Sequence, residues 1–146
     1  MAHHHGVRLA CLLALVSLSS GCAYEAGTFR SRAVAFDGQP VTLGCLDVAV
    51  GRARDSFAQG ALVSFAFGNR CEQRVTVDLV TVRAVAHGAN LVPWDPRGEL
   101  AIATLPARSV GQEVFEYRGA RADEPICVDI GGIDRDIARV EKWVCL

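Results

Sequence analysis

Apolar and polar residues alternate along much of the chain after residue 41, in short runs that turn residues separate. The range 61–68 is the clearest example, because it places Val63, Phe65 and Phe67 on one face. Alternation with a period of two is typical of a β-strand with one buried face. The same pattern predicts strands at 41–50, 74–86, 91–94, 100–105, 112–118 and 126–133.

The range 74–86 contains a change of phase in this alternation. Val75 and Val77 share one face of the predicted strand, whereas Val80 and Val82 continue the apolar pattern on the other face. The density of β-branched residues disfavours a helix here. We therefore expect a bulge, or a crossing of the chain from one sheet to another.

The last stretch, residues 134–146, fits two structures. Ile137, Val140 and Val144 have helical spacing, but 139–146 also fits a closing strand. We expect a short turn followed by a terminal strand, because Cys145 needs a fixed partner nearby.

The predicted strands together indicate an all-β fold. About seven short strands, with turns every 8–12 residues over the range 41–146, resemble an immunoglobulin-like β-sandwich. The resemblance depends on strand number and spacing, since the Cys–Trp–Cys arrangement of antibody domains is absent. A small β-barrel of the OB type is the alternative.

The N-terminal segment has a different pattern. Arg8 precedes an apolar run at 9–18, which is too short to span a bilayer as a helix. The run ends in Leu-Ser-Ser-Gly-Cys at 18–22, which resembles a bacterial lipobox, although Ser19 stands where leucine is usual. An ordinary signal peptide, cut near the same place, is the alternative. The resemblance implies that Cys22 becomes the new N-terminus and carries lipid.

This resemblance divides the chain into three parts. We expect a signal peptide at 1–21, a lipidated Cys22 with a flexible tether over 22–40, and a β-sandwich domain over 41–146. The small, polar and aperiodic tether would lift the domain off the lipid surface. The expected location is the bacterial cell envelope. Ala23 after the lipidated cysteine agrees with the outer membrane, with the domain facing the periplasm or the exterior.

The remaining cysteines predict a disulfide framework. Two of the six cysteines lie in the N-terminal segment, which leaves Cys45, Cys71, Cys127 and Cys145 for two disulfides in an exported chain. Three pairings are possible, and we predict Cys71 with Cys127 and Cys45 with Cys145. No CxxC spacing occurs, so we expect no metal site and no redox chemistry at these residues.

The charge balance and the absence of known motifs exclude several classes of function. The chain carries 15 Lys and Arg residues against 16 Asp and Glu residues, without a basic stripe, which argues against a nucleic-acid partner. His87 is the one histidine after the signal, and it stands in a turn. No nucleophile elbow and no phosphate-binding loop is present, so we expect no catalytic residues and no cofactor.

Trp94 and Arg97 are the candidate contact residues. They lie in Trp-Asp-Pro-Arg-Gly at 94–98, a turn that would present an aromatic ring and a guanidinium at a loop tip. The alternative role of Trp94 is to cap the end of the core.

The sequence thus predicts a non-enzymatic, lipid-anchored envelope protein whose sandwich is a binding or accessory module. Its expected partners are the membrane, through the lipid on Cys22, and another envelope protein. A structural subunit of an envelope complex is one alternative. A hydrolase with a carboxylate site in a cleft between loops is another.

Overall fold

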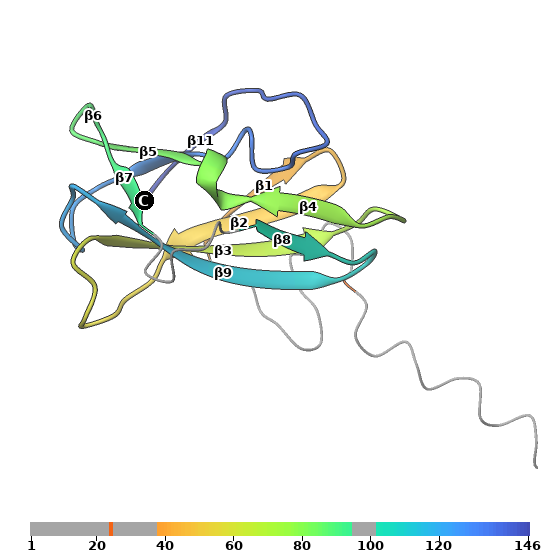
Figure 1. Cartoon of the computed structure of the whole chain (residues 1–146), viewed down its shortest axis with the longest axis horizontal. Helices are drawn as coiled ribbons and strands as arrows, with labels where there is room; N and C mark the ends of the chain where they lie inside the picture. The colour runs from red at the N-terminus through yellow and green to blue at the C-terminus, as the bar shows by residue number, and fades with distance from the viewer. Residues whose placement is uncertain (1–23, 25–37, 95–101) are drawn as a thin grey trace, which may run out of the picture.

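The structure is a computed structural model that describes residue 24 and the ranges 38–94 and 102–146 (Figure 1). In these residues the regular structure consists of eleven β-strands and one 3₁₀ turn. Most strands are short, as the alternation predicts. The elements are β1 (Gln39–Leu43), β2 (Leu46–Arg52), β3 (Ala61–Asn69), β4 (Val75–Asp78), η1 (Leu79–Thr81), β5 (Arg83–Ala86), β6 (Ala89–Asn90), β7 (Val92–Trp94), β8 (Ile102–Leu105), β9 (Val110–Arg118), β10 (Cys127–Asp129) and β11 (Trp143–Cys145).

The strands form an all-β sandwich. A five-stranded sheet has the order β1-β2-β3-β9-β7, a four-stranded sheet has the order β11-β10-β5-β6, and β4 pairs with β8. Figure 1 shows β2, β3 and β9 of the five-stranded sheet as the lower layer, with β5 and β11 above them. The described sheets do not close into a barrel. The prediction of an all-β sandwich is therefore confirmed, and the alternative prediction of a small barrel is wrong.

The core lies between the two layers. Val63, Phe65 and Phe67 of β3 are fully buried, as the alternation predicts, and they pack with Phe115 and Tyr117 of the neighbouring β9. Alternate residues of a strand point to opposite faces, so the other side chains of β3 and β9 face outward. This outer face of the five-stranded sheet carries the features described below.

The predicted single strand at 41–50 is wrong, because the chain turns back in its middle. Leu43 pairs with Leu46, so Gly44 and Cys45 form a two-residue turn between β1 and β2. Gly44 has φ of +59°, a conformation that glycine adopts without strain. A lone glycine inside an alternating run was the local signal of this hairpin.

The change of phase in 74–86 is confirmed as a crossing between sheets. β4 pairs with β8, whereas β5 pairs with β10 of the four-stranded sheet. The 3₁₀ turn lies between them, and the Asp78 carboxylate begins it by accepting a hydrogen bond of 3.1 Å from the Val80 N–H. The turn expected at His87 is present and joins β5 to β6, and the expected terminal strand is present as β11.

Both disulfides differ from the predicted pairing. Cys45 pairs with Cys71, and Cys127 pairs with Cys145, instead of Cys71 with Cys127 and Cys45 with Cys145. The cause is strand adjacency: Cys45 precedes β2 and Cys71 follows β3, its hydrogen-bonded neighbour, while Cys127 lies directly opposite Cys145. Each bond closes a short loop, of 26 and 18 residues, rather than joining distant ends of the domain.

Candidate functional site

A groove on the outer face of the five-stranded sheet is the best candidate for a binding site. Its volume is about 600 Å³, and its walls come from the loop between β2 and β3, from the outward face of β9, and from β7. Leu62 of β3 and Glu116 of β9 are paired in register and form part of its lining, beside Val114. The floor is therefore a rigid pair of strands and not a loop.

Two exposed aromatic residues line this groove. Phe57 is 90% exposed and Trp94 is 37% exposed. The Asp55 carboxylate accepts a hydrogen bond of 2.9 Å from the Phe57 N–H, and the Asp55 carbonyl accepts another from the Ala58 N–H at 3.3 Å. These two bonds hold the loop in a tight turn that leaves the Phe57 ring in solvent.

The orientation of Trp94 is set by its neighbour on β9. The Arg118 guanidinium lies 3.6 Å from the centre of the Trp94 ring, in a cation–π contact. Arg118 also forms an ion pair with Glu116, the residue opposite Trp94 in the sheet, with Nε and Oε1 3.4 Å apart. Trp94 lies outside the hydrophobic core, so it does not serve as its cap. Arg97, the other predicted contact residue, lies outside the described residues.

The charge of the groove is mostly negative. Asp55, Glu113 and Glu116 line it together with Arg118. In the described part of the chain, no group of three or more His, Cys, Asp or Glu side chains is placed to hold a metal ion. The groove thus combines aromatic surface with separate carboxylates.

The opposite end of the same sheet face is covered. Tyr24 is only 3% exposed, although it lies within the predicted flexible tether. Its hydroxyl donates a hydrogen bond of 2.5 Å to the Asp47 carboxylate, and its N–H donates one of 2.9 Å to the Arg108 carbonyl. A Cβ added at Gly68 would meet the Tyr24 ring at 2.2 Å, so the ring lies directly on the backbone of β3. This residue of the predicted tether is therefore part of the folded domain.

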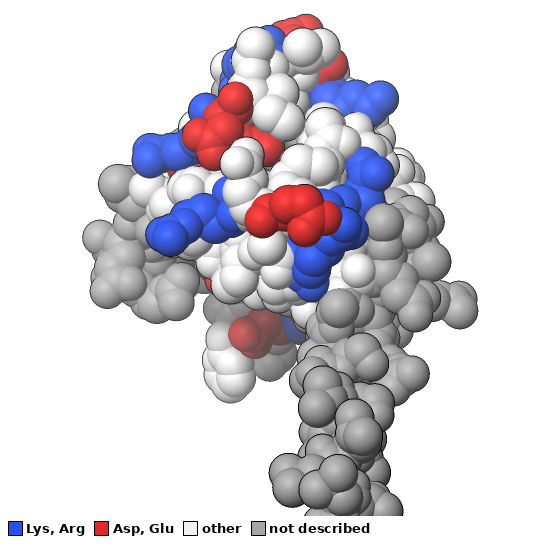
Figure 2. Space-filling view, turned by 90° about the vertical axis from the view of Figure 1, so that its right-hand side faces the viewer, with Lys and Arg blue, Asp and Glu red and all other residues white. Residues whose placement is uncertain are grey.

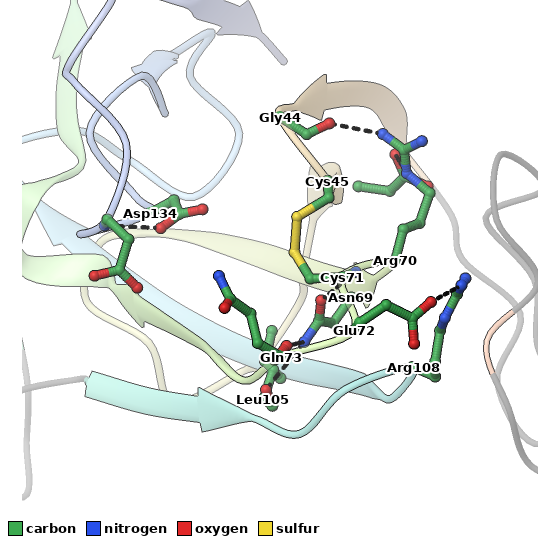
Figure 3. The surroundings of a disulfide bond; sticks show 12 residues. Gly44, Cys45, Asn69, Arg70, Cys71, Glu72, Gln73, Leu105, Arg108 and Asp134 are labelled. Atoms are coloured by element: carbon green, nitrogen blue, oxygen red, sulfur yellow. Dashed lines mark hydrogen bonds and ion pairs between the residues drawn. A yellow bond between two sulfur atoms is a disulfide. The ribbon is translucent and has the colours of Figure 1, made fainter.

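Asp47 organises this covered end. Its carboxylate is fully buried, and it also accepts a hydrogen bond of 2.9 Å from the Thr42 hydroxyl. The Arg70 Nε lies 3.1 Å from Asp47 Oδ1. The same guanidinium donates a hydrogen bond of 2.8 Å to the Gly44 carbonyl (Figure 3). The Asp47 carboxylate thus joins β1, β2, the loop after β3 and Tyr24.

Asn69 supports the first disulfide in the same region. Its side-chain oxygen accepts a hydrogen bond from the Cys71 N–H at 2.8 Å, and its amide donates to the Leu105 and Pro106 carbonyls at 3.1 and 2.8 Å (Figure 3). Sequence reasoning assigned no role to Tyr24, Asp47 or Asn69. For Asp47 and Asn69 the available signal was a polar residue within a predicted or neighbouring strand, which equally predicts a solvent-facing side chain, and no signal pointed to Tyr24.

A second buried carboxylate, Asp129, belongs to the four-stranded sheet. Burial alone would raise its pKa, but hydrogen bonds from the Lys142 N–H, the Arg83 guanidinium, the Gly131 N–H and Arg139 outweigh that effect and lower the pKa to about 2. Gly131, Arg139 and Lys142 belong to the segment that leads to β11, whereas Arg83 lies on β5. Asp129 is thus a structural anion that holds the C-terminal segment against β10.

His87 forms part of the turn between β5 and β6, as expected. Its side chain is exposed, and its Nε2 lies 2.9 Å from the Glu124 carboxylate. The predicted lipidation site, Cys22, lies outside the described residues. Within them, no helix has the length and apolar character needed to cross a membrane.

Comparisons with known proteins bear on the fold. No family model and no curated protein matches the chain. Among solved structures, the chain is similar to the crystal structure of the yjhA protein from Bacillus subtilis, with a TM-score of 0.50 and 10% sequence identity. The match covers 75% of this chain and 96% of the other. At this identity the similarity shows a shared fold and nothing more. In this chain that fold is a β-sandwich with two disulfides.

Proposed function

We propose that the protein is a non-enzymatic, lipid-anchored component of the bacterial cell envelope, and that its sandwich binds another envelope protein through the groove beside Trp94. Two disulfides favour an oxidising compartment, which agrees with export. The lipobox-like residues 18–22 supply the anchor, and lipid on Cys22 would hold the protein at the membrane.

The observation that carries the binding role is the pair of exposed aromatic rings around a groove on rigid strands. Phe57 and Trp94 leave large apolar surface in water, and the turn at Asp55 and the contact with Arg118 hold them there. Aromatic residues on a fixed scaffold are the typical centre of a protein interface. A solvent-filled groove of about 600 Å³ between them has room for side chains of a partner.

The charges of the groove indicate the chemistry of that partner. Asp55, Glu113 and Glu116 line the groove with a single guanidinium, that of Arg118, which is already paired with Glu116. Complementarity therefore favours a protein segment that presents an apolar side chain together with Lys or Arg. The interaction would weaken as ionic strength rises, because these groups lie near the surface.

The anchor is tested by the intact mass of the protein extracted from membranes, with and without reductant and alkylation. We expect residues 22–146 plus lipid, and four thiols that become reactive only after reduction. A lipid-free mass would contradict the anchor. Thiols that react without reductant would contradict the disulfide framework.

The binding role is tested by photo-crosslinking in intact cells. A photoreactive residue replaces Val114, which is exposed in the groove, or Val140, which is exposed in the C-terminal segment. We expect a discrete protein adduct at Val114 only. The change Trp94→Ala should reduce it by at least about ten-fold, because central interface aromatics contribute 2 kcal/mol or more. Equal adducts at Val114 and Val140, or no effect of Trp94→Ala, would contradict the role of the groove.

A hydrolase is the second candidate function, and one observation favours it. Asp55, Glu113 and Glu116 line the same groove, and pairs of carboxylates are the acid and base of glycoside hydrolysis. Release of reducing ends from purified cell-wall glycan by the wild type, and not by Glu113→Gln, would establish this alternative.

A structural subunit of an envelope complex is distinguished from a reversible binder by native size. A subunit would remain in one large complex after detergent extraction, and it would do so in the Trp94→Ala variant as well. A reversible binder would dissociate on dilution.

A further inference from the structure

We infer that Tyr24 holds the lipid anchor against one end of the sandwich, so that this end faces the phospholipid headgroups and the groove faces away from the bilayer. We call it the anchored end; it consists of the turn at 44–45, the loop 70–74 and the turn 106–109. The inference rests on the proposed lipidation of Cys22, and it goes further by giving the domain a fixed orientation.

The contacts of Tyr24 are those of a docked residue. Its ring lies on Gly68, its hydroxyl is bonded to a fully buried carboxylate, and its N–H is bonded to the turn at Arg108. Breaking the contact would leave the Asp47 carboxylate with one donor fewer in a buried position, which is unfavourable. Tyr24 is therefore expected to stay bound to the domain.

The spacing along the chain then limits where the lipid can be. One residue, Ala23, separates Tyr24 from Cys22. Two fully extended residues reach at most about 7 Å, so the lipidated residue lies within that distance of the Tyr24 backbone. A free tether over residues 22–40 would instead have a mean reach of about 24 Å and would let the domain rotate.

The side chains of the anchored end suit a headgroup layer. Arg70, Arg74 and Arg108 lie in its loops; Arg108 is paired with Glu72 and Arg70 with the buried Asp47. Figure 2 views the molecule from this side and shows basic and acidic groups interspersed on a largely uncharged surface. An excess of arginine within reach of the lipid favours contact with phospholipid phosphate groups.

The groove lies toward the other end of the same strand. Gly68, under the Tyr24 ring, and Leu62, in the groove lining, are six residues apart on β3. At about 3.3 Å per residue, this separation is about 20 Å. With the anchored end on the bilayer, the Phe57 and Trp94 rings project away from the lipid toward a partner.

The test uses the full-length lipidated protein in vesicles of phosphatidylethanolamine and phosphatidylglycerol. A photoreactive residue replaces Gln73 at the anchored end or Gln59 at the groove, two exposed residues of the same type. We expect phospholipid adducts to be about ten-fold more abundant at Gln73, because a short anchor gives that end a high local lipid concentration.

Two variants separate the orientation from the anchor itself. Tyr24→Ala frees the N-terminal segment, and a Gly/Ser insertion of ten residues between Ala23 and Tyr24 lengthens the connection without touching the docked ring. Each should bring the ratio of adducts at Gln73 and Gln59 close to one. The insertion keeps the test decisive if Tyr24→Ala fails to fold.

The outcomes distinguish the two claims. A lipidated protein with equal adducts at both positions overturns the orientation and leaves the proposed anchor in place. A protein without lipid by intact mass overturns the anchor, and the orientation with it. If the ratio of adducts at Gln73 to those at Gln59 stays high after the insertion, the inference is also overturned. The docked Tyr24 would then not be what orients the domain.

Discussion

Aromatic side chains are buried at one end of the outer sheet face and exposed at the other. At the anchored end, Tyr24 is buried and its hydroxyl is bonded to Asp47. At the groove, Phe57 and Trp94 remain in solvent, and the charged groups beside them are exposed or paired at the surface. The same two strands, β3 and β9, support both ends.

This difference separates stability from binding. A buried carboxylate with several donors contributes to folding only while all its partners are present. Exposed aromatic rings contribute little to folding and remain available to a partner. Substitutions at the anchored end should therefore change the free energy of unfolding, and substitutions at the groove should change binding.

The largest effect is expected for Asp47→Ala. The change leaves the Tyr24 hydroxyl, the Thr42 hydroxyl and the Arg70 guanidinium without their common acceptor. Removing one partner of a buried ionic cluster lowers the free energy of unfolding by about 3–5 kcal/mol. Urea unfolding measures it, with Glu113→Ala in the groove as the matched control, expected within about 0.5 kcal/mol of the wild type. Similar losses for both variants would remove the distinction between the two ends.

The next effect is an acid transition at Asp129, which lies in the other sheet. Its pKa is lowered to about 2 from the ordinary value of 3.8. Its contribution is complete above about pH 4 and is lost as pH falls toward 2, and it amounts to about 2 kcal/mol. Unfolding measured between pH 5 and pH 2 should show this loss in the wild type and not in Asp129→Asn. An unchanged pH dependence in the variant would contradict it.

A smaller effect is expected for Gly68→Ala, since the added Cβ would overlap the Tyr24 ring. Overpacking of this kind lowers the free energy of unfolding by about 1–3 kcal/mol. In a double-mutant cycle, most of that loss should disappear in the Tyr24→Ala background, where no ring is present. Additive losses would mean that Tyr24 does not lie on Gly68 in solution.

The smallest and most discriminating comparison is between two buried tyrosines. Tyr24→Phe removes a hydrogen bond to a carboxylate and should lower the free energy of unfolding by about 1.5 kcal/mol. The Tyr117 hydroxyl has no hydrogen-bond partner among the described residues, so Tyr117→Phe should leave stability unchanged or increase it. Thermal unfolding of both variants measures the difference. A loss for Tyr117→Phe as large as that for Tyr24→Phe would contradict it.

The amino-acid sequence alone predicted the local features of this protein. The period of two placed Val63, Phe65 and Phe67 in the core, and the change of phase after Val77 marked the crossing between sheets. These features depend on residues that are neighbours in the chain, and steric and hydrophobic preferences act on them before any strand has found a partner. The number of cysteines likewise predicted two disulfides.

Only the tertiary structure decided which distant residues meet. The disulfide partners follow from β2 lying beside β3 and β10 lying beside β11, an order that depends on the packing of the whole sandwich. Tyr24 and Asp47 are 23 residues apart, and neither residue type specifies the other. Asp47 has the alternation of a solvent-facing residue, yet it is fully buried and bonded to Tyr24, a residue distant in the sequence. The alternation in the sequence predicts which side chains of a strand point away from the core. Whether those side chains are then covered depends on how the whole domain packs.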